Sequence, residues 1–206
     1  MSGMRDEGGA RSVTRTALYD AKQIDTVIDA MTRRAGALLA GAPRVTVVGI
    51  LRRGAPLADR VAAGLRRDVG TAPAERVDLK ITRYADDLTL LYPETRFVEN
   101  PAHAGLDLAG AHVLVVDDVV YTGHSLLRAV QYLCGKNPSA LRTAVLVDRS
   151  TGKLPVPVDI AGARLAVAEG DIVECHVPPY DPDWGIFLVG RRHDAGAACP
   201  NRPGAG

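Results

Sequence analysis

The chain has 206 residues, of which 47% are apolar and 24% charged, so it is long and apolar enough to bury one sizeable core. Its 25 basic and 24 acidic residues leave a net charge of +1, which gives no overall field for holding a polyanion or an acidic membrane surface. The three cysteines lack CxxC or Cys/His spacing, so they support neither a disulfide framework nor a zinc site and fit a reducing compartment.

The two ends of the chain differ in composition from the rest. Residues 1–12 are Gly-rich and charged, and residues 193–206 are rich in Gly, Ala and Pro, so we predict disordered tails around one domain at 13–192. The N-terminal segment lacks the apolar core of a signal peptide, and no run of about 18 apolar residues occurs anywhere. We therefore expect a cytoplasmic protein without a membrane span.

The first predicted element is an amphipathic helix. Asp20 and Gln23 form a capping box, and apolar residues recur at helical spacing from Ile24 to Leu39 until Gly41 ends the run. The short apolar run 45–50 then predicts a strand. A basic turn, Arg52-Arg53-Gly54, follows it, and a helical period resumes from Pro56 to Leu65.

The second half of the chain alternates strands with helical periods. Residues 76–83 alternate as in a half-buried strand, and a long polar connection over about 84–104 predicts a functional lid. The apolar run 112–116 predicts a strand that ends at Asp117-Asp118, and helical spacing follows from Leu126 to Leu133. Further strands are expected at 141–148 and, on the edges, near 164–167, 171–174 and 186–189.

This alternation predicts an α/β domain with a parallel sheet, whose ligands bind at the carboxyl ends of the strands. Three loops should converge there: 51–54, 117–125 and 148–153.

The segment 113–125, VLVVDDVVYTGHS, carries the strongest chemical signal. Backbone N–H groups at 122–125, where a helix begins, suit a phosphate monoester, and Gly123 permits close backbone approach. Asp117 and Asp118 are acceptors, which suit sugar hydroxyls or a hydrated divalent cation. Together these features indicate a sugar phosphate. The alternative is a buried strand closed by an ordinary Asx turn.

The same segment resembles the 5-phosphoribosyl 1-diphosphate signature of the type I phosphoribosyltransferases, which implies their fold with a small hood and a flexible lid. The resemblance implies that Asp117 and Asp118 hold the ribose hydroxyls and Mg²⁺, and that the 5-phosphate lies on Tyr121–Ser125. The implied donor-binding segment is Asp117, Asp118, Val119, Val120, Tyr121, Thr122, Gly123, His124 and Ser125. Arg52, Arg53 and Gly54 resemble the family's pyrophosphate loop, where a cation must meet the leaving diphosphate.

Four segments are similar to the group of pyrimidine operon attenuation regulators and uracil phosphoribosyltransferases, over about residues 15–177. They are VGILRRGAPLADRVA, DLKITRYADDLT, VLVVDDVVYTGHSL and TAVLVDRS. The last implies a base-binding site at Val147, Asp148 and Arg149, although Ser150 stands where the group has glycine.

The resemblance also bears on the base. The related 6-oxopurine enzymes carry a carboxylate and a lysine where this chain has Tyr121 and Asp148, which cannot take those roles, so a pyrimidine, most simply uracil, is expected. Trp184 is open to two interpretations, an aromatic packed under an edge strand or a base-stacking residue similar to that of the purine enzymes. A purine base is therefore the alternative acceptor.

The expected catalytic residues are Arg53, Asp117, Asp118 and Arg83, with the lid excluding water from Mg²⁺-bound diphosphate. No covalent nucleophile is needed. The group implies a homo-oligomer, a dimer or larger. It also raises messenger RNA as a partner, against which stands the stretch 150–157, where only Lys153 is cationic.

Overall fold

The computed structural model describes residues 13–69, 75–82, 96–98, 105–150, 154–168 and 170–191. The predicted tails, Arg83, Lys153 and most of the predicted lid lie outside these ranges. The elements are β1 (Val13–Tyr19), α1 (Ala21–Leu38), β2 (Val45–Leu51), α2 (Gly54–Gly64), the π-helical turn η1 (Leu65–Val69), β3 (Glu75–Thr82), β4 (Arg96–Val98), β5 (His112–Val120), α3 (His124–Cys134), β6 (Ala140–Asp148), β7 (Ile160–Arg164), β8 (Ile172–His176) and β9 (Gly185–Arg191).

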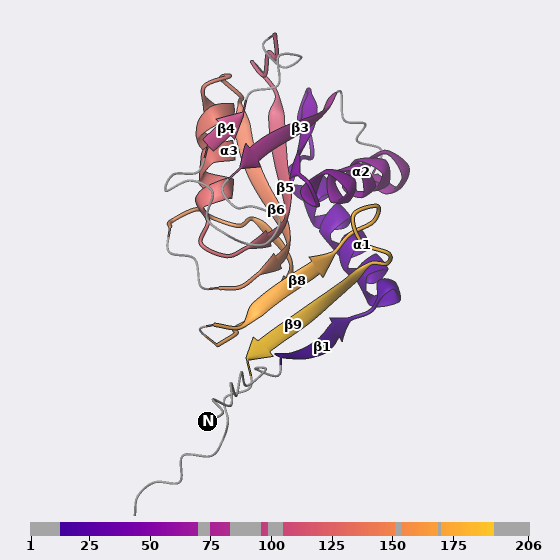
Figure 1. Ribbon diagram of the computed structural model, residues 1–206. Helices are drawn as coiled ribbons and strands as arrows, with labels where there is room; N and C mark the ends of the chain where they lie inside the picture. The colour runs from indigo at the N-terminus through magenta and orange to yellow at the C-terminus, as the bar shows by residue number, and fades with distance from the viewer. Residues whose placement is uncertain are drawn as a thin grey trace, which may run out of the picture.

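The main sheet has six strands in the order β4-β3-β2-β5-β6-β7. Strands β3, β2, β5, β6 and β7 are parallel, and β4 is antiparallel to β3 at the edge. Helices α1 and α2 cover one side of this sheet and α3 covers the other (Figure 1). The predicted α/β class with a parallel-centred sheet is confirmed.

Alternate residues of the central strands fill two separate cores. On the side of α1 and α2, Val47, Leu114 and Leu146 pack with the helical residues Ile28 and Leu57. On the other side, neighbouring strand residues pack against the α3 residues, which include Leu126, Ala129 and Leu133. Because both faces are covered, the strands read as continuous apolar runs.

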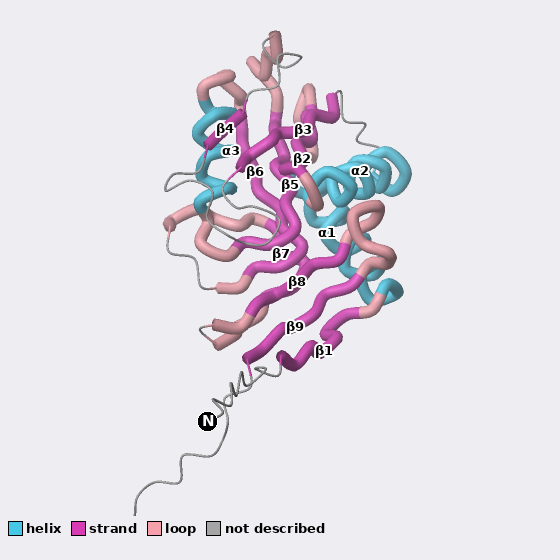
Figure 2. Tube along the Cα trace, in the orientation of Figure 1, coloured by secondary structure: helices cyan, strands magenta, loops and turns pink. Residues whose placement is uncertain are grey.

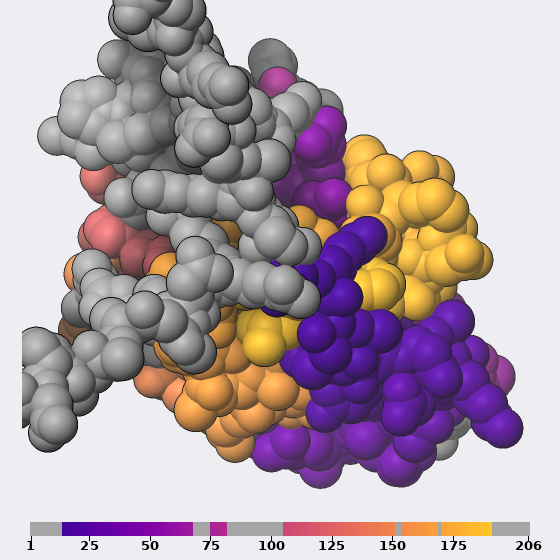
Figure 3. All heavy atoms as spheres, turned by 60° about the horizontal axis from the view of Figure 1, so that its bottom comes forward, coloured from indigo at the N-terminus to yellow at the C-terminus, as the bar shows by residue number. Residues whose placement is uncertain are grey.

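A second, antiparallel sheet of β1, β9 and β8 forms the hood at the lower end of the molecule (Figure 2). Its inner residues Val173, Cys175 and Ile186 join the core that lies under α1. The pairing of β1 with β9 places the N-terminal segment, indigo in Figure 3, against the yellow C-terminal one. The hood is therefore attached to the main sheet by shared apolar packing.

Several sequence predictions are refined. The capping box of Asp20 and Gln23 is present at the start of α1. The prediction that β5 ends at the two acids is wrong, because Val119 and Val120 still pair with β6. The seventh strand spans 160–164 rather than 164–167, and β1 and β4 were not predicted. Within the described ranges, no helix is long and apolar enough to cross a membrane.

Candidate active site at the carboxyl ends of the strands

The two adjacent carboxylates, Asp117 and Asp118, lie within the paired part of strand β5, near its carboxyl end, rather than in a loop. Asp117 is 8% exposed, and its carboxylate accepts the Asp118 N–H at 2.9 Å. Asp118 is partly buried and accepts the Val119 N–H at 2.8 Å. The strand therefore holds both acids on a rigid element beside the two parallel neighbours of β5.

Burial makes it costly for this pair to carry two negative charges. Desolvation raises the pKa of Asp117 well above its usual range, and the charge of Asp118 raises it further. Desolvation also raises the pKa of Asp118, against the opposing effects of the Val119 N–H and the Arg53 guanidinium. A cation placed between the two carboxylates would relieve this penalty, because each would then gain a counter-charge.

The two carboxylates fit Mg²⁺ by their chemistry. The donors are carboxylate oxygens, which a hard divalent cation prefers. In the part of the chain that is described, no group of three or more His, Cys, Asp or Glu side chains could hold a metal ion. The two acids would thus contribute only part of a coordination shell, and Mg²⁺ commonly takes the remainder from water and substrate oxygens.

The segment after β5 turns directly into α3. Gly123 is the N-cap residue with φ +85°, a conformation that side chains with a Cβ adopt at a cost. Its carbonyl accepts the Leu127 N–H at 2.8 Å, and the Thr122 hydroxyl lies 2.7 Å from His124 Nδ1. The N–H groups of the first turn of a helix have no acceptor earlier in the helix, so the positive end of α3 at this turn is suited to an anion.

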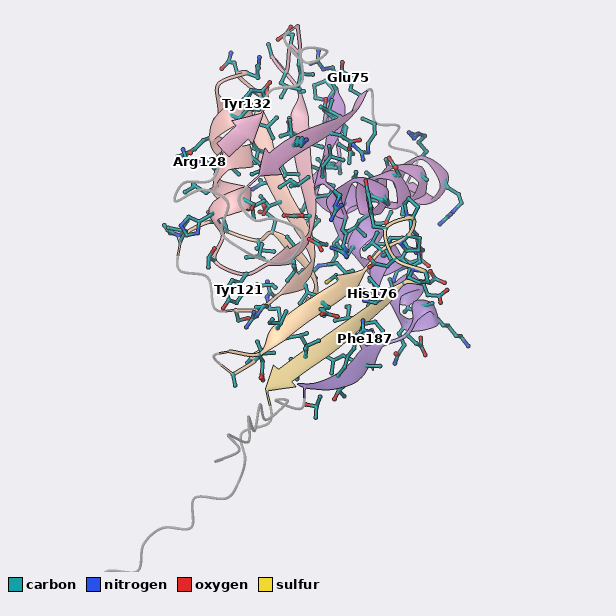
Figure 4. The ribbon with its side chains drawn as sticks, viewed as in Figure 1. Glu75, Tyr121, Arg128, Tyr132, His176 and Phe187 are labelled. Atoms are coloured by element: carbon teal, nitrogen blue, oxygen red, sulfur yellow. The ribbon has the colours of Figure 1, made fainter. Side chains whose placement is uncertain are left out.

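A cavity of about 420 Å³ opens at this turn. It is lined by Asp117, Val119, Val120, Tyr121, Thr122, Gly123, His124, Ser125, Leu126, Arg149, Gly170, Asp171, Ile172 and Val173. The stretch from Gly170 to Val173 leads into the hood strand β8. The sequence predicted a strand here but did not place these residues in the site. Tyr121 lies on the hood side of α3, near the end of β8 (Figure 4).

Of the three residues expected to bind the base, Arg149 alone lines the cavity. Val147 is fully buried in the core. The Asp148 carboxylate accepts the Ser150 N–H at 2.8 Å and lies 3.4 Å from Arg164 Nε, so it holds the loop. The structure thus separates three residues that are neighbours in sequence: Val147 and Asp148 are successive residues of β6, whose side chains point to opposite faces of the sheet, and Arg149 follows the end of the strand.

Arg149 is an unusual group in this cavity. Its residue is only 4% exposed, and its guanidinium lies 4.1 Å from the centroid of the Tyr121 ring. Among the described residues, its Nε has no hydrogen-bond partner. No carboxylate pairs with it among the described residues. A buried cation without a carboxylate partner in the described part of the chain is suited to bind an acceptor on a ligand.

The predicted pyrophosphate turn meets the acids from the side of β2. The peptide bond between Leu51 and Arg52 is cis. An ideal Cβ built on Gly54 would lie 2.7 Å from the Val116 carbonyl oxygen and 3.0 Å from Asp117 Cα, so the absence of a side chain permits this approach. The Arg52 guanidinium lies 5.6 Å from the Tyr180 ring centroid.

Two further neighbours of this turn were not predicted from the sequence. Arg53 donates to Asp181 through Nε at 2.8 Å and through a terminal nitrogen at 3.0 Å. The Cys175 Sγ lies 3.8 Å from the Asp118 carbonyl oxygen, and burial raises the pKa of this thiol. Both neighbours lie on hood segments far from the acids in sequence, so no local pattern signals them.

Trp184 is not among the described residues that line the cavity, and it packs against the core instead. Its ring contacts the core under α1, and the Arg60 guanidinium lies 5.0 Å from its centroid. The packing interpretation of this residue is the one that these contacts favour.

The model of the phosphoribosyl transferase domain matches residues 14–177. The chain belongs to the phosphoribosyltransferase family. The resemblance to type I phosphoribosyltransferases, drawn from the segment 113–125, is confirmed. This phosphoribosyltransferase is 33% identical over 179 residues to the bifunctional protein PyrR of Roseiflexus sp. (strain RS-1), covering 84% of this chain and 93% of that protein.

A second relative and a solved structure agree with this assignment. The bifunctional protein PyrR of Deinococcus radiodurans is 34% identical over 163 residues, which are 76% of this chain and 86% of that protein. The hypoxanthine phosphoribosyl transferase of Trypanosoma cruzi superimposes with a TM-score of 0.66 at 21% identity, covering 85% of this chain and 91% of that one. The latter likeness shows that the fold is shared.

Proposed function

We propose that this phosphoribosyltransferase transfers ribose 5-phosphate from 5-phosphoribosyl 1-diphosphate to a pyrimidine base, with uracil as the expected acceptor. The observation that supports it is the joint position of a buried acid pair and a helix N-terminal turn. Asp117 of this pair and the turn residues 121–125 border one cavity of about 420 Å³, which is a suitable size for a small ligand. The turn can hold the 5-phosphate while the acids hold the ribose hydroxyls.

In this reaction, the bond between ribose C1 and the diphosphate oxygen breaks, a bond from C1 to the base nitrogen forms, and the proton of that nitrogen passes to solvent. Positive charge develops at the ribose as the diphosphate leaves. Mg²⁺, when bound at Asp117 and Asp118 with the substrate, supplies charge neutralisation for the leaving group. Arg53 lies close enough to lower the pKa of Asp118, so it contributes a second cation near this point.

The preference for a pyrimidine is supported by Tyr121 and Arg149, which line the cavity, and by Asp148, which precedes Arg149 in the chain. Tyr121 precedes the Thr-Gly turn, so this position carries a phenol ring and not a carboxylate. The guanidinium of Arg149 lies over that ring. Asp148 is engaged by Ser150 and Arg164, and it offers no donor to a purine carbonyl. Arg149 supplies donors that a pyrimidine carbonyl oxygen can accept.

The direct test incubates the protein with 5-phosphoribosyl 1-diphosphate, Mg²⁺ and one base at a time, and detects nucleotide and pyrophosphate. Uracil should give the highest turnover. Product from hypoxanthine but not from uracil would contradict the base assignment, and no product from any base would contradict the proposed activity. In the active reaction, Asp118→Asn should fold normally yet turn over more slowly, because a ribose contact is weakened.

Regulatory RNA binding is not part of this proposal. Over residues 150 and 154–168, which the structure describes, Arg164 is the only Lys or Arg, and it pairs with Asp148. Phosphate contacts from cations dominate RNA affinity. Filter binding of the protein to its own leader RNA, with and without uridine monophosphate, checks this point, and tight salt-sensitive binding would contradict it.

A further inference from the structure

The loop between β8 and β9, residues 177–184, brings one carboxylate to the pyrophosphate turn. Asp181 accepts Arg53 Nε at 2.8 Å and a terminal nitrogen of the same guanidinium at 3.0 Å. This two-point contact joins residues that are 128 positions apart. Such paired hydrogen bonds fix the plane of the guanidinium as well as its distance.

The carboxylate is itself held by its own loop. Asp181 accepts the Val177 N–H at 2.8 Å, and its own N–H donates to the Val177 carbonyl at 3.2 Å. The Asp181 side chain is 12% exposed, whereas that of Arg53 is 35% exposed. Asp181 is therefore the fixed partner of the pair, and Arg53 is the partner that remains accessible to solvent.

The contact leaves part of the guanidinium available. Asp181 engages Nε and one terminal nitrogen, so the other terminal nitrogen keeps its N–H donors on a different edge of the plane. The same guanidinium favours the charged form of Asp118, which places it within the field of the acid pair. Arg53 thus lies between a hood carboxylate and the carboxylates of β5.

The pair is charged throughout the working range of most enzymes. The hydrogen bond from Arg53 lowers the pKa of Asp181 to about 2. The same contact raises the pKa of Arg53 above its usual value. Ordinary changes of pH therefore do not release the guanidinium.

We propose that Asp181 is a positioning residue that orients Arg53 toward the leaving diphosphate before the substrate binds. This inference rests on the proposed phosphoribosyl transfer. A flexible arginine on a turn would otherwise have to lose its rotamer freedom during each turnover, and prior orientation removes that loss from the reaction. The hood thereby acts on the chemistry through one side chain of the main domain.

The test compares Asp181→Asn with Glu174→Gln. Asparagine retains the size of the side chain and an acceptor for the Val177 N–H, but it loses the charge and the two-point contact. Glu174 lies on the same hood, where it pairs with Arg15 at 3.1 Å, so Glu174→Gln also breaks a hood ion pair without touching the turn. Thermal unfolding of both variants reports whether each protein remains folded.

We expect kcat of Asp181→Asn to fall about tenfold while Glu174→Gln stays near wild type, and Asp181→Glu to recover part of the loss. In an Arg53→Ala background, Asp181→Asn should cause little further loss, because it acts only through that guanidinium. A residue with a merely structural role would give additive losses in this cycle.

Wild-type or higher kcat for Asp181→Asn would overturn the inference, and so would additive losses in the Arg53→Ala background. Absence of turnover by the wild-type protein with every base would overturn the proposed function and this inference together. Turnover by the wild type, combined with an unaffected Asp181→Asn variant, would remove the inference alone.

Discussion

Gly54→Ala tests the close approach of the pyrophosphate turn to the twin acids. The added Cβ would lie 2.7 Å from the Val116 carbonyl oxygen, 3.0 Å from Asp117 Cα and 3.2 Å from an Asp117 carboxylate oxygen. Two of these three atoms belong to the backbone of a central buried strand, which cannot move aside cheaply. Overpacking of this kind costs about 1–3 kcal/mol.

For a domain of this size, each 1 kcal/mol lowers Tm by roughly 2–4 °C, so the expected decrease is about 2–12 °C. Turnover should fall by more than the loss of folded protein explains, because the strain is applied at Asp117. Circular dichroism melts and steady-state rates measure the two effects. Gly105→Ala is the matched control, since nothing lies within 4 Å of its Cβ and its φ is not positive. A Gly54→Ala protein that melts and turns over like Gly105→Ala would refute the reasoning.

Three further predictions concern charge. The pKa of Asp181 is lowered from 3.8 to about 2, so its ion pair contributes about 2 kcal/mol to the free energy of unfolding above pH 4, and this contribution is lost as the pH falls toward 2. In acid denaturation, the difference in stability between the wild type and Asp181→Asn should therefore close over that interval. A difference that stays constant with pH would contradict the ion pair as its source. The pKa of Asp117 is raised, so the metal-free protein should lose stability as the pH rises through that pKa. Mg²⁺ should consequently raise Tm more at pH 8 than at pH 5. Equal increases in Tm at the two pH values would argue against the acid pair as the metal site. Arg149→Met should raise KM for the base about tenfold or more, as expected for losing a charged hydrogen bond. It should not lower Tm, because it removes a buried cation that has no carboxylate partner among the described residues. A large fall in Tm with unchanged KM would instead give Arg149 a structural role.

Local sequence patterns predicted the elements that carry strong periodicity. The capping box and the apolar period defined α1, and continuous apolar runs located β2, β5 and β6. β1 was missed because its sequence, VTRTALY, does not alternate cleanly between apolar and polar residues. The end of β5 was misplaced because two acids usually mark the end of a buried strand, whereas here the ladder to β6 continues beyond them.

The part of the site that lies on one continuous motif could be predicted from local sequence, and the rest could not. The turn from Tyr121 to Ser125 follows from one continuous motif, and the structure gathers it with Asp117 and Arg149 around one cavity. Asp181 could not be found in this way, because its partner Arg53 is fixed by tertiary packing and not by spacing. Val147 shows the converse limit. A resemblance marks a whole segment, whereas this residue belongs to a strand that is covered on both faces, so its side chain is buried in the core.

The pairing of β1 with β9 has a consequence for how a newly made chain matures. Synthesis proceeds from the N-terminus, so the strands bearing the acids leave the ribosome before β9 exists. Until then β1 lacks its neighbour, and the loop carrying Asp181, which immediately precedes β9, has no anchored frame. We therefore expect a newly made chain to form the turn at 121–125 before Asp181 can orient Arg53, so that the proposed transfer reaction begins only after β1, β8 and β9 have paired.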